Sequence, residues 1–156
     1  MKKKLIIVGL TCLTVGGILG GIIGALGTTR MFASGMLLIK RCEVYKAQDQ
    51  AWQAYISDKP QIAEWELTQA ISSITDARTS GYPDTNELNQ LEFEAEARLA
   101  LVNKKAGAEA VYEQHMTKAK LLAQLLPVKV SSSLQTSEQI TDFIGKMDTK
   151  QRKQND

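Results

Sequence analysis

The chain has 156 residues, of which 44% are hydrophobic and 6% aromatic, and it contains two cysteines, one histidine and three prolines. This composition excludes a disulfide scaffold and argues against a Cys/His zinc site or an all-β sandwich with regular turns. The net charge of +2 is unevenly spread, because residues 43–113 carry −7 and the segments on both sides are basic. A nucleic-acid-binding domain needs a basic patch on its folded core, so we expect no nucleic-acid partner.

The N-terminal segment has the composition of a membrane-spanning helix. Three lysines form a basic flank at residues 1–4, and residues 5–27 contain no charged side chain. At 1.5 Å per residue this segment covers roughly 34 Å, enough to cross a hydrocarbon core of about 30 Å. The apolar region of a signal peptide has only about 7–15 residues. We therefore predict a retained anchor, with cleavage near Gly27 as the alternative.

The lysine flank also predicts the orientation of this span. Basic residues next to a span favour the cytoplasmic side, so we expect a cytoplasmic N-terminus. Three basic residues beyond the span, Arg30, Lys40 and Arg41, favour the opposite orientation. The predicted location is the inner (cell) membrane, crossed once, with the bulk of the chain in the periplasm or another extracytoplasmic space.

Small residues recur every four positions within this span. Gly16, Gly20 and Gly24 form one row, and Gly17 and Gly21 belong to an adjacent row. Such a stripe lets the backbone of another helix approach closely within the lipid bilayer. We predict that the span packs against other transmembrane helices or subunits of a membrane complex. The choice between a homo-oligomer and a hetero-complex stays open.

Residues 28–127 are predicted to form a helical extracytoplasmic domain. Its first part, up to Ile56, continues the membrane helix or lies at the membrane interface. Apolar stripes at helical spacing then predict helices over about 60–77, 85–106 and 108–126. We expect Thr85 to cap the second of these. The predicted fold class is all-α, with one transmembrane helix followed by a small bundle of helical hairpins.

The C-terminal region is predicted to be a linker at 128–136, a short amphipathic helix at 137–147 and a disordered tail at 148–156. Ser137 is the expected cap of the short helix. An isolated helix of this length is marginal in water, so it must dock on the body of the protein or on a partner chain. Its apolar stripe comprises Ile140, Phe143, Ile144 and Met147.

Two predicted hairpins, at about 44–77 and 85–126, resemble tetratricopeptide repeats. Small residues stand at Ala51 and Ala54 of the first helix, and the second helix follows a small–large–small–large spacing at Ala63, Leu67, Ala70 and Ile71. The hallmark Trp and Tyr are absent, Tyr112 stands where the repeat prefers a small residue, and the hairpins are offset by about 49 residues against the usual 34. The resemblance implies a protein-binding scaffold with a concave face. A generic antiparallel bundle is the alternative.

No motif in the sequence indicates an enzyme, a cofactor or a metal site. His115 is the single histidine, and no paired nucleophile and carboxylate accompany it. Glu92 and Glu96 share a helix face, where we expect them to be solvated. An enzyme or redox protein that uses His115 or Cys42 is therefore the weakest hypothesis.

We expect a non-catalytic, membrane-anchored accessory or scaffold subunit of a membrane-associated protein complex. The alternative is a secreted or periplasmic peptide- or protein-binding module, released by cleavage near Gly27. Trp52, Tyr55 and Trp65 are the candidate residues for protein binding, although core packing is the favoured role of each.

Overall fold

The structure is a computed structural model, and it describes residues 35–155. The chain divides into two units, Met1–Ile39 and Lys40–Asp156. The predicted transmembrane segment at 5–27 and its glycine rows lie outside the described residues. Within the described range, none of the helices combines the length and the hydropathy that a membrane crossing requires. All the regular secondary structure described is helical, which confirms the all-α fold class for this part of the chain.

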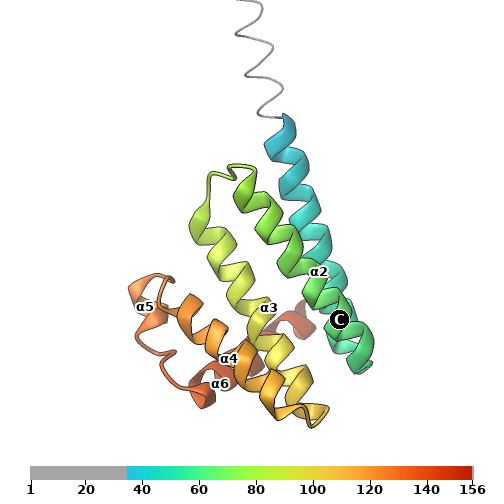
Figure 1. Cartoon of the computed structure of the whole chain (residues 1–156), viewed down its shortest axis with the longest axis vertical. Helices are drawn as coiled ribbons and strands as arrows, with labels where there is room; N and C mark the ends of the chain where they lie inside the picture. The colour runs from blue at the N-terminus through green and yellow to red at the C-terminus, as the bar shows by residue number, and fades with distance from the viewer. Residues whose placement is uncertain (1–34, 156) are drawn as a thin grey trace, which may run out of the picture. The chain divides into compact units, whose positions relative to one another are not determined.

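Six helical segments follow one another between residues 35 and 155 (Figure 1). The first occupies residues 35–56 and is called helix 35–56 below. After a turn that contains Asp58 in a left-handed conformation, the chain reverses direction. The remaining helices are α2 (Pro60–Thr79), α3 (Thr85–Lys105), α4 (Glu109–Ala123), α5 (Val128–Ser131) and α6 (Ser137–Asn155).

Helices α2, α3 and α4 pack in chain order, and α6 lies across α3 and α4. Helix 35–56 and α2 form one hairpin, which packs on α3 through a cluster of small and aliphatic residues. The small residues let the helices approach closely, while the leucines fill the space between them. This cluster comprises Ala51, Ala54, Ala63, Leu67, Ala70, Ala95, Leu99 and Val102.

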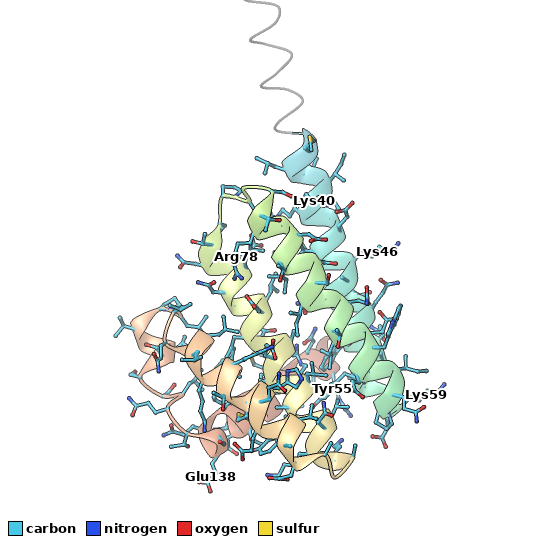
Figure 2. The ribbon with its side chains drawn as sticks, viewed as in Figure 1. Lys40, Lys46, Tyr55, Lys59, Arg78 and Glu138 are labelled. Atoms are coloured by element: carbon cyan, nitrogen blue, oxygen red, sulfur yellow. The ribbon has the colours of Figure 1, made fainter. Side chains whose placement is uncertain are left out.

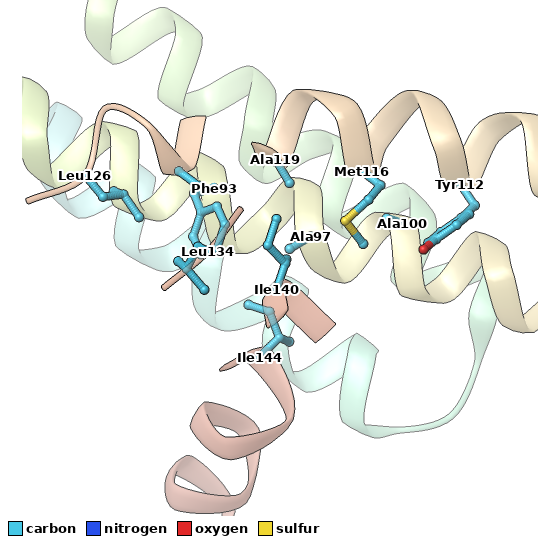
Figure 3. Packing of buried hydrophobic residues seen from close by; sticks show 11 residues of the cluster. Phe93, Ala97, Ala100, Tyr112, Met116, Ala119, Leu126, Leu134, Ile140 and Ile144 are labelled. Carbon is cyan, nitrogen blue, oxygen red and sulfur yellow. The ribbon is translucent and has the colours of Figure 1, made fainter. Parts of the chain in front are cut away.

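A second cluster joins α3, α4 and α6 (Figure 3). Ile140 and Ile144 of α6 are fully buried there and face Ala97 and Met116. Phe143 adds an aromatic contact with Phe93, whose ring centroid lies 6.1 Å away. The short amphipathic helix therefore docks on the body of the protein, one of the two arrangements that its apolar stripe left open.

Two glycines end helices in the same way. Gly81 follows α2 and Gly107 follows α3, each with a positive φ of 78° and 74° respectively. At each end the glycine N–H and the next N–H donate to carbonyls of the last helical turn. This is the Schellman arrangement, which favours glycine because a Cβ would be strained at such a φ.

The helix caps lie one residue before the expected ones. Asp84, not Thr85, is the N-cap of α3, and its carboxylate accepts from the N–H of Glu87. For α6, the Thr136 hydroxyl accepts from the N–H of Gln139, and the Gln139 side chain accepts from the N–H of Thr136. This reciprocal capping box outweighs a single hydroxyl at the next position, because it satisfies two free N–H groups.

The C-terminal region differs from its prediction in two places. The linker at 128–136 contains the short helix α5, and the tail at 148–156, predicted to be disordered, is helical as far as Asn155. The reason is a tertiary contact, since the carboxylate of Asp148 is buried against the side chain of Arg98, fifty positions earlier. Composition alone indicated a solvated tail, because the partner of Asp148 is distant in the sequence.

Candidate functional site

The structure separates the three aromatic residues predicted to bind protein. Trp52 is 3% exposed and belongs to the core, and Tyr55 next to it is half-buried. Their rings lie 6.1 Å apart on helix 35–56. Trp65 on α2 is 60% exposed and lines a groove between helix 35–56 and α2. The predicted helix-packing glycines, Gly16, Gly17, Gly20, Gly21 and Gly24, lie outside the described residues.

Trp65 stands at a shallow groove between helix 35–56 and α2. Ile62, one turn earlier on α2, is 47% exposed. The groove has a volume of about 350 Å³, and Lys46 of helix 35–56, labelled in Figure 2, is one of its lining residues. An exposed indole beside an apolar neighbour and mixed polar groups is typical of a protein-contact surface. The groove is lined by Glu43, Lys46, Ala47, Gln50, Trp65, Glu66, Gln69 and Ser73.

Trp52 and Tyr55 instead enclose the guanidinium group of Arg98 on α3. The Cζ atom of Arg98 lies 5.1 Å from the centroid of Trp52 and 5.9 Å from that of Tyr55. Its Nε and Nη2 atoms donate to Oδ1 of Asp148 at 3.2 and 3.0 Å, and Nη1 donates to Glu94 at 3.4 Å. We call Trp52, Tyr55, Glu94 and Arg98 the Arg98 cage. The fourth residue in contact with Arg98 is Asp148, which belongs to α6.

Burial in the Arg98 cage changes the acidity of its members. Desolvation raises the pKa of Tyr55 to about 12, and the nearby Asp148 carboxylate acts in the same direction. Desolvation also raises the pKa of Glu94, against the opposing charge of Arg98. Both pKa shifts have burial as their largest cause. The cage is therefore a low-dielectric environment, in which paired charges are stabilised and unpaired charges are costly.

Sequence reasoning missed both Arg98 and Asp148. Arg98 stands between Ala95 and Leu99 in the apolar stripe of α3, where its burial of 97% was not expected. A usable signal existed for its partner, because Asp148 continues the register of Ile140 and Ile144 at four-residue spacing. A carboxylate in line with the apolar stripe of a docked helix is turned towards the body of the protein, where its burial is costly without a compensating cation.

A second buried carboxylate joins α3 to α4. Glu96 is 2% exposed, which corrects the expectation of a solvated group. Its Oε2 atom lies 2.6 Å from Nδ1 of His115, and its Oε1 atom lies 3.6 Å from Nζ of Lys118. The two α4 side chains compensate the burial of Glu96 and fix how α4 lies on α3. Among the residues described, no group of His, Cys, Asp or Glu side chains could hold a metal ion.

A third polar cluster lies around Glu87, near the start of α3. Its carboxylate accepts hydrogen bonds from the hydroxyls of Tyr45 and Tyr82, and Arg41 donates to it at 3.3 Å. The hydrogen bonds from the two tyrosines, followed by the charge of Arg41, lower the pKa of Glu87. Burial raises the pKa of Tyr82 to about 12. The cluster ties helix 35–56 to α3 and to the turn before it.

Comparisons with protein-family models, with curated proteins and with solved structures find no significant match for this chain. The resemblance to tetratricopeptide repeats therefore stays a prediction from the sequence.

Proposed function

We propose that the chain is a non-catalytic, membrane-anchored accessory or scaffold subunit of a membrane-associated protein complex. Residues 5–27 are the anchor, and their glycine rows pack against other spans. The helical domain binds a neighbouring subunit outside the membrane, as tetratricopeptide-like hairpins do. The groove at Trp65 is the contact surface of this domain.

The exposure of Trp65 is the observation that carries the proposal. A tryptophan that is 60% exposed gains little from folding, whereas burying it in an interface removes a large apolar surface from water. Trp52, on the neighbouring helix, is buried, so the fold already has a tryptophan that serves its core. Trp65 together with Ile62 has the composition of an interface centre with a polar rim.

The start of helix 35–56 supports the membrane anchor. Met36, Leu38 and Ile39 are each at least 59% exposed, and they occupy different sides of the helix. A helix that is apolar on all sides is suited to lipid or to a protein interior, not to water. Lys40 and Arg41 follow at once, where long basic side chains reach headgroups from the end of an apolar segment.

The polar clusters favour a scaffold over an enzyme. His115 of α4 is held against Glu96 of α3, and Arg98 of α3 against Asp148 of α6, so both pairs join two helices. Groups that are satisfied within the fold are poorly placed to bind or transform a substrate. Replacing Cys42, which is exposed, with alanine is expected to leave complex formation intact.

The test is gentle detergent extraction of the native membrane, followed by a native gel and mass spectrometry. We expect the full chain, with its N-terminal segment intact, to migrate with larger membrane proteins. Gly20→Leu is expected to abolish this association by blocking helix contact in the bilayer. Trp65→Ala is expected to weaken it, whereas Leu121→Ala, which removes an equally exposed apolar side chain on α4, should not.

A chain that migrates alone, in wild-type and variant forms alike, would refute the subunit assignment. A mature chain that begins after Gly27 and is recovered without membrane would instead support the secreted binding module. Unchanged association of the Gly20→Leu variant would refute only the docking role of the span.

A further inference from the structure

Helix α6 lies on a surface formed by three other helices. Its N-terminal half packs on α3 and α4 through Ile140 and Ile144, and its C-terminal half reaches the Arg98 cage through Asp148. These three residues are spaced by four positions, and they are the buried residues of the part of α6, residues 137–153, whose side chains are described. We call the underlying surface the α6 groove. Its apolar part includes Phe93, Ala97, Ala100, Met116 and Ala119.

Two of the three core clusters close without α6. The cluster between helix 35–56, α2 and α3 contains no α6 residue, and neither does the cluster around Val44 and Ile74. A single chain segment, residues 132–136, connects α6 to α5, and most of it is exposed. Undocking α6 therefore leaves two of the three core clusters complete.

The Arg98 cage is organised independently of α6. Glu94 lies one turn before Arg98 on the same helix, and both aromatic rings belong to helix 35–56. If α6 leaves, the guanidinium group keeps one carboxylate and two ring faces. The cage is then a preformed receptor for a carboxylate, because its geometry does not have to be built when the ligand arrives.

The cage also holds a donor that α6 leaves unused. Nε1 of Trp52 is buried, and no acceptor for its N–H exists among the described residues. Buried indole N–H groups normally have a partner. With α6 docked, the guanidinium group of Arg98 is therefore satisfied, while the N–H of the adjacent Trp52 is not.

We propose that the α6 groove is a helix-binding site and that α6 is its exchangeable resident. The outside occupant is an amphipathic helix of a partner subunit with aliphatic residues at positions i and i+4 and a carboxylate at i+8, the pattern of Ile140, Ile144 and Asp148. This proposal rests on the proposed function, and it adds a second contact surface to the groove at Trp65. A buried ion pair suits this role, because it sets register and partner choice more than it adds stability.

The first experiment measures exchange with a defined probe. A fluorescent peptide with the sequence of residues 137–155 is titrated against the full chain in detergent. In the wild type, the tethered α6 competes at an effective concentration in the millimolar range, so we expect weak binding. In the Asp148→Lys chain, Arg98 repels the resident helix, and we expect the peptide to bind at least about tenfold more tightly.

Two further variants make this result specific. Asp142→Lys produces the same charge change on an exposed face of α6 and should leave binding at the wild-type level. Arg98→Glu combined with Asp148→Lys restores the pair with reversed charges, so the tethered helix should again exclude the wild-type peptide. Equal binding to the Asp148→Lys and Asp142→Lys chains would overturn the proposal. So would loss of cooperative unfolding in the Asp148→Lys chain, because α6 would then be an integral part of the core.

The second experiment tests the partner in the native membrane. An emptied groove should retain more of the partner subunit, so Asp148→Lys should increase co-purification, while Trp65→Ala should decrease it.

If the peptide exchanges but co-purification does not change, the partner assignment of the groove fails and the proposed function stands. If wild type and variants all migrate alone, the proposed function itself fails. Exchange of α6 between two labelled copies of the wild type would assign the groove to self-association and overturn the partner claim.

Discussion

A single buried arginine, Arg98, connects three parts of the described fold. It joins α3 to α6 through Asp148 and to helix 35–56 through two aromatic rings. Removing a guanidinium group from water is costly unless carboxylates compensate the charge. Arg98 and its partners therefore specify how α6 lies on the body, whereas the apolar residues around them supply most of the free energy of docking.

Asp148→Asn is expected to lower the free energy of unfolding by about 3 kcal/mol, because it leaves a buried cation short of one carboxylate. The loss should fall at the lower end of the range for broken buried pairs, since Glu94 remains beside Arg98. Urea denaturation followed by circular dichroism measures the change. Asp142→Asn on the exposed face of α6 is the control, and it should change stability by less than about 0.5 kcal/mol.

The Glu87 cluster predicts how the stability of the domain depends on acid. Hydrogen bonds from Tyr45 and Tyr82 hold the pKa of Glu87 below its usual value of 4.5. The folded state therefore releases this proton more readily than the unfolded chain does. The resulting stabilisation is complete above pH 4.5 and is lost as the pH falls through the lower, folded-state pKa.

Glu87→Gln should remove this part of the acid sensitivity. We expect the variant to be less stable than the wild type at pH 7 and the difference to shrink towards pH 3. Urea denaturation midpoints measured at pH 7 and at pH 3 test this prediction. Glu113→Gln, on the exposed face of α4, is the matched control. A stability difference that stays constant between pH 7 and pH 3 would contradict the assigned role of Glu87.

At the scale of single helices, the glycines after α2 and α3 differ from the glycine within α6. Gly107 has a positive φ, while Gly145 lies inside a helix with open space around its Cα. Gly107→Ala should cost about 1 kcal/mol through backbone strain. Gly145→Ala should stabilise the chain by up to about 1 kcal/mol through helix propensity. Thermal unfolding tests whether Gly107→Ala lowers the melting temperature and Gly145→Ala raises it.

The capping box of α6 gives a second comparison at this scale. Thr136→Ala removes the hydroxyl that accepts from Gln139 and should cost about 1 kcal/mol. Ser137→Ala, one position later, should cost clearly less, because Ser137 contributes no side-chain cap in the structure. Amide hydrogen exchange in the first turn of α6 reports the difference. Equal effects of the two variants would contradict the assignment of Thr136 as the N-cap of α6.

At the scale of the whole molecule, the two tryptophans separate folding from partner binding. Trp52→Ala should destabilise the domain by about 3–5 kcal/mol, because it empties a buried site next to Arg98. Trp65→Ala should change stability by less than about 0.5 kcal/mol and weaken association with the partner subunit. Denaturation and co-purification of the same two variants provide the measurements. A large loss of stability in Trp65→Ala would assign this residue to the fold instead.

Much of the helical architecture follows from the sequence. Amphipathic stripes predicted α2, α3 and α4, since a helix of a small domain must bury one face and the spacing of apolar residues reveals that face. The docking face of α6 was also predictable from Ile140 and Ile144. The uncharged composition of residues 5–27 predicts a membrane anchor, because lipid demands a long run without charged side chains.

Only the tertiary structure decided which polar residues are buried. The exposure of Trp65 was readable from the sequence, because Trp65 lies opposite the apolar stripe that α2 presents through Ala63 and Leu67. Trp52, by contrast, is buried against Arg98 of α3. The pairing of Arg98 with Asp148 joins residues fifty positions apart, and it converts an expected disordered tail into the last turns of α6. Such contacts depend on how helices pack, and packing is a property of several segments together, not of any one stretch of sequence.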